Sequence, residues 1–302
     1  MNILFSSDDN YAYHLMVSIK SILIFNDKCI SFYVFDLGIS TENKNIILQM
    51  INSSKSNIVF IPVDVNDFRR FPKNIGYISL ATYARLKAVD YLPSDVNKII
   101  YLDIDTLVFD DLTPLWETNI ENYGVAACFD SFVEYEIPEH KYTISLSSQH
   151  YYFNAGVMIF NLDIWREIDV FNSSLDWLKK HGEKAIYQDQ DQDILNGIFE
   201  DNVYYLDCRF NFMPNQLERI RRYQSGKLVV LNNIEKTTMP VAISHFCGPE
   251  KPWHSNCHHF KMHYYYNLLS KIKAVKGDKL PISLFIRSVI RDFKRKLKYK
   301  IY

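Results

Sequence analysis

The stretch Ile99-Ile100-Tyr101-Leu102-Asp103-Ile104-Asp105 reads as a short apolar strand that ends on two aspartates. In an α/β sheet the carboxyl ends of the strands open onto the ligand crevice, so we expect both carboxylates there. In an extended chain residues i and i+2 project to the same side, so Asp103 and Asp105 can close on one divalent cation. Such a cation prefers carboxylates and keeps coordination sites for substrate phosphates. Aspartates at a strand end more often only begin a turn, so the pattern needs support from elsewhere in the chain.

That support is the lack of a glycine-rich phosphate cradle. The 302 residues contain nine glycines, each isolated, and neither G-x-G-x-x-G nor G-x-x-x-x-G-K-[ST] occurs. If this protein binds a nucleotide diphosphate, the backbone amides of a glycine loop are not the main groups that neutralise it. A cation on Asp103 and Asp105 can do so. The combination favours an enzyme that uses a nucleotide sugar over a dehydrogenase or an ATPase.

The composition indicates an ample core and a basic C-terminal segment. The apolar fraction is 48%, and the chain holds 20 Phe and 21 Tyr. Its net charge is −1, but residues 271–302 hold eleven Lys or Arg against two Asp, so residues 1–270 carry about −10 by difference. That acidic body has no basic field suited to nucleic acid.

The cysteines and the N-terminus bear on the compartment. The five cysteines are odd in number and widely spaced, without a C-x-x-C, which is typical of reduced thiols in a cytosolic protein. The N-terminus has no basic region and only a short apolar run, unlike a signal peptide. No segment approaches the ~18 continuous apolar residues of a spanning helix. We therefore expect a soluble or peripheral protein.

Strands and helices alternate along the chain. The expected strands are Asn2–Ser7, Ile30–Phe35, Asn57–Val63, residues 99–103, Tyr123–Cys128, Phe153–Phe160 and Val241–Ser244. The expected helices are the pattern from Leu15 to Leu23, Ser40–Ile51, Ser79–Tyr91, Leu162–Lys180 and Asp191–Phe199. This alternation indicates βαβ units and a parallel sheet. Residues 207–240 have an irregular pattern and are expected to form loops over a cleft. The prediction is one α/β domain over residues 1–270, followed by a basic helical tail over residues 271–302.

Polar residues also follow the first and last expected strands. Asp8-Asp9-Asn10 comes directly after the first strand, where its position favours a helix N-cap. It can also present an acceptor to the N–H of a uracil. His245 follows the last strand and can complete a site with two carboxylates, a set that suits manganese. Lys251, in a loop rich in Gly and Pro, can meet a diphosphate as a point charge.

Three other polar clusters allow more than one interpretation. Five of the nine histidines lie between residues 245 and 263 with Cys247 and Cys257, but the spacings match no standard structural zinc pattern. The Gln-Asp repeat over residues 188–193 suits the acidic first turn of a helix, which is the favoured interpretation in isolation. It can also hold a sugar's hydroxyls and face its anomeric carbon. Phe153-Asn154-Ala155-Gly156 is either a buried turn or an amide placed against a hydroxyl.

With these clusters collected, the chain resembles glycosyltransferase family 8 from residue 1 to about residue 260. The matching blocks are Asp-Asp-Asn-Tyr-Ala (8–12), Thr-Tyr-Ala-Arg-Leu-Lys (82–87), Tyr-Leu-Asp-Ile-Asp (101–105), Leu-Thr-Pro-Leu-Trp (112–116), Tyr-Tyr-Phe-Asn-Ala-Gly-Val (151–157), Gln-Asp-Gln-Asp-Ile-Leu-Asn-Gly (190–197), Arg-Phe-Asn-Phe-Met-Pro (209–214) and His-Phe-Cys-Gly-Pro-Glu-Lys-Pro-Trp-His (245–254). Ordered blocks of this length are very specific. Within the family, the chain most closely resembles the bacterial lipooligosaccharide α-1,4-galactosyltransferases.

The resemblance implies a GT-A fold, the Rossmann-like α/β fold of nucleotide-diphospho-sugar transferases, and a UDP-hexose donor. It places manganese, with magnesium as the alternative, on Asp103, Asp105 and His245. The implied donor contacts are Asp8, Asn10 and Tyr11 at the uridine, Gly248 and Lys251 at the diphosphate, Arg85, Asn154, Asp191 and Gln192 at the sugar, and Ile104 between the two aspartates. The implied acceptor contacts are Tyr77, Ile78, Phe132, Pro214 and Cys247.

Two positions depart from the family pattern. A histidine is expected where Tyr77 stands, which bears on the choice of acceptor. The Gln-Asp repeat is two residues longer than the family pattern, so Gln190 can replace Gln192 in register. The match to the following Ile-Leu-Asn-Gly favours Gln192.

The implied activity is transfer of galactose from UDP-galactose to a terminal β-galactose, as in lactose, of lipooligosaccharide or lipopolysaccharide. The family implies retention of the anomeric configuration, so the new linkage is α. Because a neutral amide such as Gln192 is a poor nucleophile, we favour attack by the acceptor on the face from which UDP leaves, with Asp191 positioning the donor hydroxyls. A UDP-glucose-dependent α-glucosyltransferase is the near alternative. A catalytically silent carbohydrate- or membrane-binding module is the distant one, and the intact set of Asp103, Asp105 and His245 argues against it.

The tail is predicted to be an amphipathic helix. Lys and Arg lie on its other faces, and its apolar residues recur at spacings of four, three, four and four. These apolar residues are Ile286, Ile290, Phe293, Leu297 and Ile301. Such a helix suits an anionic membrane surface. The alternative is a helix packed on the domain with a solvated basic face. The expected location is the cytoplasm, peripheral on the inner face of the bacterial inner membrane, beside a lipid-linked oligosaccharide acceptor.

Overall fold

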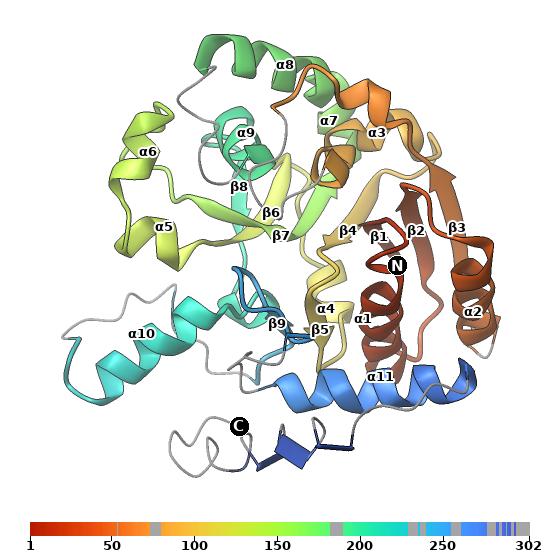
Figure 1. The fold of residues 1–302 in the computed structure, drawn as a ribbon. Coiled ribbons are helices and arrows are strands. Elements are labelled where there is room, and N and C mark those ends of the chain that lie inside the picture. The colour runs from red at the N-terminus through yellow and green to blue at the C-terminus, as the bar shows by residue number, and fades with distance from the viewer. Residues whose placement is uncertain are drawn as a thin grey trace. The chain divides into compact units, whose positions relative to one another are not determined.

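The computed structural model describes residues 1–52, 54–72, 80–181, 190–228, 235, 240–254 and 261–276, and near the C-terminus residues 282–283, 286–287, 289–290 and 293. The chain divides into two compact units, whose elements are labelled in Figure 1. The first unit comprises residues 1–10, 28–103 and 114–206, and the second comprises residues 11–27, 104–113 and 207–302. Among the described residues, no helix combines the length and the apolar character that crossing a membrane requires.

A seven-stranded sheet with the strand order β3-β2-β1-β4-β7-β6-β8 runs through the first unit (Figure 1). Its strands are β1 Asn2–Ser7, β2 Ser31–Asp36, β3 Asn57–Pro62, β4 Lys98–Leu102, β6 Val125–Phe129, β7 Phe153–Asn161 and β8 Val203–Tyr205. The pairs β1–β2, β1–β4, β2–β3 and β6–β8 are parallel. The predicted strands of this sheet match the observed ones to within two residues at each end.

The direction of β7 departs from the predicted parallel sheet. β7 is antiparallel to both of its neighbours, β4 and β6. All nine of its residues are buried. A strand that is buried on both faces shows no alternation of apolar and polar residues. Its sequence therefore could not distinguish parallel from antiparallel pairing with its neighbours. The sheet is therefore mixed, with mostly parallel pairs.

Helices connect and cover these strands. They are α2 Thr41–Asn52, α3 Ala88–Tyr91, α5 Ser131–Tyr135, α6 Glu139–Thr143, α7 Leu162–Glu167, α8 Val170–His181 and α9 Gln190–Ile198, with 3₁₀ helices η1 Val65–Phe68 and η2 Leu80–Lys87. A short helix, α4 Thr113–Trp116, follows residue 112. The predicted helix Ser40–Ile51 is confirmed by α2, and Ser40 Oγ accepts a hydrogen bond from the Asn43 N–H at 3.3 Å. The predicted helix Asp191–Phe199 is confirmed by α9.

Two predicted helices need correction. The stretch Leu162–Lys180 breaks into α7 and α8, because Asp169 adopts a left-handed φ of +46° that aspartate tolerates better than most residues. Its carboxylate then accepts from the Asn172 N–H at 3.3 Å as α8 begins. The stretch Ser79–Tyr91 is mostly 3₁₀ helix rather than α-helix, and Ser79 itself lies outside the described residues.

Aromatic stacking fixes α7 and α9 against the sheet. The Trp165 ring stacks on Phe160 of β7, with the centroids 4.1 Å apart, and on Phe199 at 5.4 Å. The Trp165 indole N–H donates to the Gly124 carbonyl at 2.9 Å. A Cβ at Gly124 would lie 2.3 Å from the Phe199 ring, so only glycine allows this close approach. The packing holds α9, which carries Asp191 and Gln192, in a fixed place beside β7.

In its described residues, the second unit combines a two-stranded sheet with helices. Its elements are α1 Ala12–Phe25, β5 Thr106–Val108, η4 Cys208–Phe210, α10 Pro214–Gln224, β9 Ile243–His245 and α11 Met262–Lys276. β5 and β9 are antiparallel, and Thr106 pairs with His245. The Ser21 hydroxyl of α1 accepts from the Val108 N–H at 3.0 Å, which ties α1 to β5.

Helix α10 contradicts the prediction that residues 207–240 form loops. Its buried side chains include Gln216 and Arg219 beside Leu217, so no apolar stripe marks it in the sequence. The signal that was missed is at its start, where Pro214 occupies the first turn and Gln216 Oε1 accepts from the Met213 N–H at 3.0 Å.

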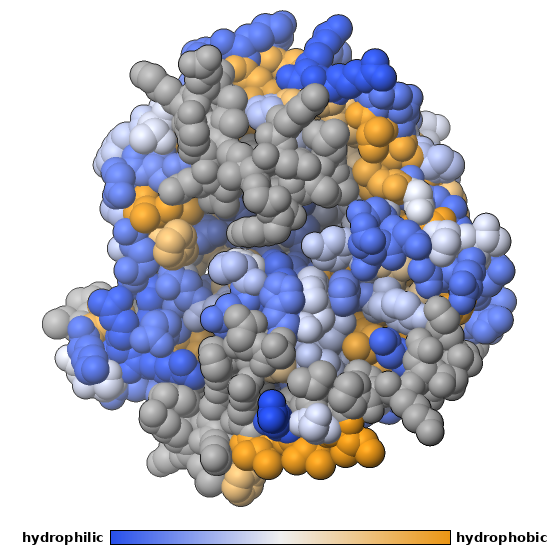
Figure 2. All heavy atoms as spheres, viewed as in Figure 1, coloured by the Kyte–Doolittle hydropathy of each residue, from blue (hydrophilic) through white to orange (hydrophobic). Residues whose placement is uncertain are grey.

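The described residues of the tail are helical and exposed. Their exposed apolar side chains are Ile282, Ile286, Val289, Ile290 and Phe293. An orange band follows the lower edge of the face drawn in Figure 2, where Figure 1 draws the last described residues. The division of the chain at residues 270 and 271 remains a prediction, and α11 runs across that point to Lys276.

Candidate active site

The two aspartates of the opening motif lie on the turn between β4 and β5. Asp103 follows β4 directly, Ile104 and Asp105 form the turn, and β5 begins at Thr106. The expectation of an extended chain through both aspartates is therefore wrong. The reason is that the strand leaves the main sheet at this point: Asp105 C=O accepts from the Phe246 N–H at 2.9 Å, and β5 pairs with β9.

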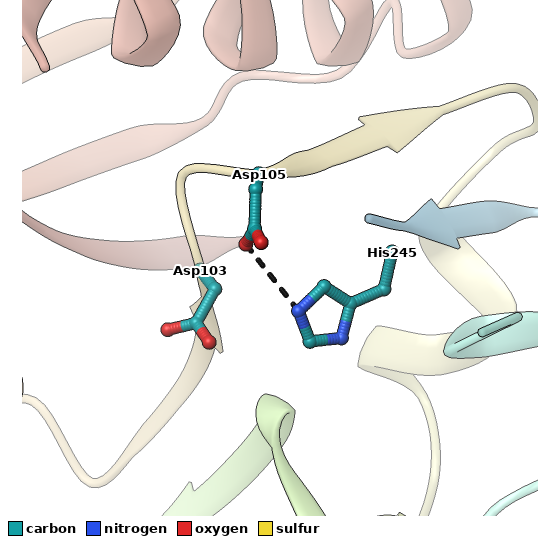
Figure 3. Close-up of side chains that lie close together, drawn as sticks. All are labelled: Asp103, Asp105 and His245. Atoms are coloured by element: carbon teal, nitrogen blue, oxygen red, sulfur yellow. Dashed lines mark ion pairs between the residues drawn. The ribbon is translucent and has the colours of Figure 1, made fainter. Parts of the chain in front are cut away.

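His245 reaches the same turn from the end of β9. Its Nε2 lies 3.3 Å from Asp105 Oδ1. Figure 3 marks this ion pair with a dashed line. Asp103, Asp105 and His245 each offer one ligand atom, and these atoms lie within 4.8 Å of one another. Asp103 is the last residue of the first unit and is joined to Asp105 through Ile104 alone. The three predicted metal ligands are thus together.

Asn211 sets the orientation of the His245 ring. The His245 Nδ1–H donates to Asn211 Oδ1 at 2.9 Å, and both side chains are buried. This leaves Nε2 directed at the Asp105 carboxylate, 3.3 Å from Oδ1, where a cation held by that carboxylate can also be reached. A metal-ligating histidine usually makes this kind of outer hydrogen bond through its other nitrogen. The donor set of one imidazole and two carboxylates fits a divalent cation such as Mn²⁺.

Lys251 adds a positive charge beside the same carboxylate. Its Nζ donates to Asp105 Oδ2 at 2.5 Å and to the Phe246 carbonyl at 3.1 Å. Burial raises the pKa of the Asp105 carboxyl, but Lys251 and His245 lower it by more and hold it well below its usual range. Gly248, in the loop between them, has a φ of +86°, which favours glycine. Asp105 therefore stays ionised, as a metal ligand must.

Arg85 organises the polar residues of the first unit. Its guanidinium donates to Asp103 Oδ1 at 3.0 Å and to the Ala155 carbonyl at 2.6 Å, and its Nε lies 2.9 Å from Asp191 Oδ2. The Tyr101 ring lies under the guanidinium, 4.1 Å from ring centroid to Cζ. Burial lowers the pKa of Arg85, but Asp191, Tyr101 and Asp103 raise it by more, so the side chain remains a cation.

Asp191, which lies beside Arg85, has a carboxyl whose pKa is shifted upward. It is 4% exposed, and burial raises its pKa to about 7 against the opposing effect of Arg85. The nearby Asp103 charge raises the pKa further. A buried acid with a raised pKa beside a buried arginine is typical of a functional site.

The two amides predicted to face the sugar both contact the first residues of β7. Gln192 Oε1 accepts from the Ala155 N–H at 2.9 Å. Asn154 Oδ1 accepts from the Gly156 N–H at 3.0 Å, and its Nδ2 donates to Asp130 Oδ2 at 3.0 Å. Arg85, Asp191, Gln192 and Asn154 are therefore brought together around one strand end. The Gln190 side chain lies outside the described residues.

Sequence reasoning gave no role to Asp130, Tyr101 or Asn211. Asp130 caps α5 by accepting from the Phe132 and Val133 N–H groups, and it also holds Asn154. Its signal was the one used for Asp103, an acid directly after a buried strand. Tyr101 donates to Asp103 Oδ1 at 2.8 Å from within β4. The contact of Asn211 with His245 joins residues 34 apart, and no local pattern indicates it.

The residues predicted to bind uridine, Asp8, Asn10 and Tyr11, lie between the end of β1 and the start of α1. The N-cap of α1 is Tyr11, which makes no side-chain capping hydrogen bond, so the capping interpretation of Asp8-Asp9-Asn10 is wrong. Asp9 Oδ1 instead accepts from the Ser40 N–H and the Asn43 Nδ2, both at 2.8 Å. Tyr11 is 37% exposed, with its ring edge-on to Trp253 at 5.9 Å.

The predicted acceptor residues are only partly described. Phe132 on α5 is 49% exposed, which suits a contact with a ligand. Pro214 begins α10, and Cys247 is half-buried after β9; both belong to the second unit. Tyr77 and Ile78 lie outside the described residues.

The model of the family described as "Glycosyl transferase family 8" matches residues 2–257. The chain belongs to glycosyltransferase family 8. A putative glycosyltransferase of Haemophilus influenzae is 43% identical over 263 residues, which are 87% of this chain and 76% of that protein. The lipopolysaccharide 1,3-galactosyltransferase of Salmonella typhimurium is 27% identical, over 84% of this chain and 73% of that protein.

A solved structure supports the same assignment. The crystal structure of the galactosyltransferase LgtC in complex with donor and acceptor sugar analogues matches with a TM-score of 0.81 and 40% sequence identity, covering 93% of this chain and 98% of that chain. Family and structure confirm the resemblance found in the sequence and the GT-A type of α/β fold. The chain is a glycosyltransferase whose residues Asp103, Asp105 and His245 form a candidate metal site.

Proposed function

We propose that this glycosyltransferase moves galactose from UDP-galactose to a terminal β-galactose of lipooligosaccharide or lipopolysaccharide, with an α-linkage in the product. The main support is the cluster of Asp103, Asp105 and His245, whose ligand atoms lie within 4.8 Å of one another beside the Lys251 cation. The likeness to LgtC, a galactosyltransferase solved with donor and acceptor sugar analogues, supports the choice of sugar. The lipopolysaccharide galactosyltransferase of Salmonella typhimurium supports the class of acceptor.

Asp103, Asp105 and His245 would hold Mn²⁺, or Mg²⁺ as the alternative. When bound, the ion supplies positive charge that stabilises the UDP leaving group. Asn211 keeps His245 Nε2 available as a ligand by accepting from Nδ1–H. Lys251, with the Gly248 turn before it, supplies a second positive charge for the diphosphate. Asp8, Asn10 and Tyr11 are assigned to the uridine.

Residues of the first unit are assigned to the sugar. Arg85 and Asp191 form a buried pair, with Nε 2.9 Å from Oδ2, whose nitrogen and oxygen atoms can orient donor hydroxyls. Gln192 is assigned to the anomeric carbon, where its carbonyl dipole stabilises developing positive charge. A solved structure of an active-site glutamine-to-glutamate mutant of LgtC supports an active-site role for a glutamine in this fold.

The reaction proceeds by attack on the face from which UDP leaves. The bond between the anomeric carbon and the diphosphate oxygen breaks, and the bond from the acceptor hydroxyl oxygen to the same carbon forms. The hydroxyl proton passes to a phosphate oxygen of the departing UDP. This route retains the α-configuration and needs no protein nucleophile, which suits a site whose nearest assigned group is a neutral amide.

Donor turnover tests the proposal. The full-length protein is incubated with Mn²⁺, lactose and either UDP-galactose or UDP-glucose, and released UDP and the trisaccharide product are measured. We expect a clear preference for UDP-galactose and loss of transfer in Asp103→Ala. The matched control is Asp176→Ala, which removes an exposed aspartate of α8. A preference for UDP-glucose would move the assignment to a glucosyltransferase, and no turnover of either donor would refute it.

The tail is proposed to bind an anionic membrane surface at the inner face of the inner membrane. Its described apolar side chains are exposed, with Ile282 74% and Phe293 63% accessible, among Lys and Arg. Each basic residue near an anionic surface contributes about 1 kcal/mol. Deleting residues 280–302 should release the protein from anionic liposomes in a sedimentation assay and leave transfer to soluble lactose unchanged. Continued sedimentation of the truncated protein, or loss of transfer, would contradict this role.

A further inference from the structure

A fully buried carboxylate on α9 has no part in the proposed chemistry. Asp193 is 0% exposed, and its Oδ1 accepts from the Tyr152 hydroxyl at 2.6 Å and from His140 Nε2 at 2.7 Å. These three residues, here named the Asp193 network, come from α9, from the residue before β7 and from α6. Asp193 Oδ2 has no hydrogen-bond partner among the described residues. Among the described residues, the hydrogen bonding of this carboxylate therefore falls on Tyr152 and His140.

The position of Asp193 would suit an apolar residue as far as burial is concerned. Its neighbours Ile194 and Leu195 on α9 are 1% and 0% exposed and belong to the core. Burying a carboxylate costs folding free energy unless the group is hydrogen-bonded. Removing one of its hydrogen-bond donors is therefore strongly destabilising. Two directional hydrogen bonds hold a helix at one rotation about its axis, which apolar packing does less strictly. The network therefore orients α9 as well as packing it.

The other polar side chains of α9 show what this orientation serves. Asn196 Oδ1 accepts from the Phe153 N–H at 2.8 Å, and its Nδ2 donates to the Phe153 carbonyl at 2.9 Å. Gln192, one helical turn earlier, accepts from the Ala155 N–H at 2.9 Å. Residues i and i+4 on a helix lie about 6 Å apart, close to the spacing of residues i and i+2 on a strand. The two amides thus meet alternate residues of β7 only at one rotation of α9.

We propose that the Asp193 network is a positioning device that sets the rotation of α9, and thereby the place of Gln192 and Asp191 against the donor sugar. Asp193 directly follows Gln192, so rotation of α9 that breaks its two hydrogen bonds also carries Gln192 away from Ala155. The network contacts neither UDP nor sugar in this proposal. The inference rests on the proposed role of Gln192 in sugar transfer.

Three variants remove or keep single hydrogen-bond donors. Tyr152→Phe removes one hydroxyl and keeps the ring, and His140→Phe removes the donor of α6. His140→Gln keeps an N–H near the position of Nε2. Ile47→Val, a buried change on α2, is the control for a general loss of stability, since it costs about 0.5–1.5 kcal/mol.

The first measurement does not depend on catalysis. Amide hydrogen exchange is followed by mass spectrometry in peptides that cover residues 152–156, whose N–H groups at 153 and 155 bond to α9. We expect faster exchange there in Tyr152→Phe and His140→Phe, and wild-type exchange in His140→Gln and Ile47→Val. Unchanged exchange in both Phe variants would overturn the inference, whatever the enzyme transfers.

The second measurement is steady-state transfer from UDP-galactose to lactose, with the affinity for UDP measured by calorimetry. A misplacement of about 1 Å at a reacting group can cost about 100-fold, so kcat should fall by about 10-fold to 100-fold in the two Phe variants. UDP affinity should stay within about twofold, and His140→Gln should recover most of kcat. An equal loss of UDP affinity, or a His140→Gln variant as slow as His140→Phe, would show general disruption and overturn the positioning role. If exchange changes as expected but the wild type transfers no sugar, the proposed function fails and the network stands as a determinant of α9 orientation.

Discussion

Replacing Asp191 by asparagine should change how the stability of the protein depends on pH. Burial raises the pKa of Asp191 from 3.8 to about 7 in the folded protein. Between these values the folded protein keeps a proton that the unfolded chain has released, so stability falls as pH rises through this window and is level above pH 7. An asparagine side chain binds no such proton, so Asp191→Asn should remove this decrease in stability between pH 3.8 and about pH 7.

The size of the effect follows from the width of the window. From pH 5 to the folded pKa of about 7 is two pH units, which correspond to about 2.7 kcal/mol at 1.36 kcal/mol per unit. The free energy of unfolding of Asp191→Asn should therefore gain about 2.7 kcal/mol on that of the wild type between pH 5 and pH 8. The change at pH 5 also contains the lost contact with Arg85, so the difference between the two pH values carries the prediction.

Urea unfolding at both pH values, in EDTA so that no cation occupies Asp103, measures this difference. Asp176→Asn, an exposed change on α8, is the control and should follow the wild type. The Asp191→Asn variant should also lose most of its sugar transfer, which would make Asp191 a residue kept for function at the expense of stability. If Asp191→Asn and wild type change in parallel from pH 5 to pH 8, the carboxyl is ionised throughout and the reasoning about its burial is wrong.

Three further predictions concern the metal, the sugar and the diphosphate. Asn211→Leu should weaken Mn²⁺ binding by about 10-fold to 100-fold in calorimetry, because outer hydrogen bonds to a ligating histidine are worth about that much, while Asn211→Asp, which keeps an acceptor, should bind nearly as wild type. Gln192→Ala should lower kcat more than it raises the donor KM, since a contact made in the transition state appears in kcat, and Gln190→Ala should be milder; the reverse order would place the two-residue insertion differently. Lys251→Met should weaken binding of UDP in the presence of Mn²⁺ and leave the Kd for lactose unchanged, and an unchanged UDP affinity would remove Lys251 from the diphosphate site.

The elements that could be predicted from the sequence are those whose own residues are buried in a regular pattern. β1 and β4 are short apolar runs, and their bounds were found to within one residue. The position of Asp103 and Asp105 followed from the run of β4, and that of His245 followed from the apolar run over residues 241–244; the structure adds that their ligand atoms lie within 4.8 Å of one another. The family blocks extended this to Arg85, Asn154, Asp191 and Gln192, which the structure gathers around the first residues of β7.

What could not be predicted depends on contacts between distant residues. The antiparallel pairing of β7 is decided by its neighbours, β4 and β6, and by nothing in its own apolar run. α10 buries polar side chains whose partners lie elsewhere, such as Arg219 with Glu235. The hydrogen bonds of Asn211 to His245 and of Asp193 to His140 join residues 34 and 53 positions apart. Local periodicity carries no information on such pairs.

The anomeric configuration of the product tests the central claim most directly. Wild-type protein, UDP-galactose, lactose and Mn²⁺ are combined in one sample, and the new anomeric proton is followed by NMR as the trisaccharide forms. We predict the small coupling constant of an α-galactoside, with no product when EDTA replaces Mn²⁺ or when Asp105 is changed to Ala. A β-galactoside, or an α-galactoside formed at full rate in EDTA, would contradict the account.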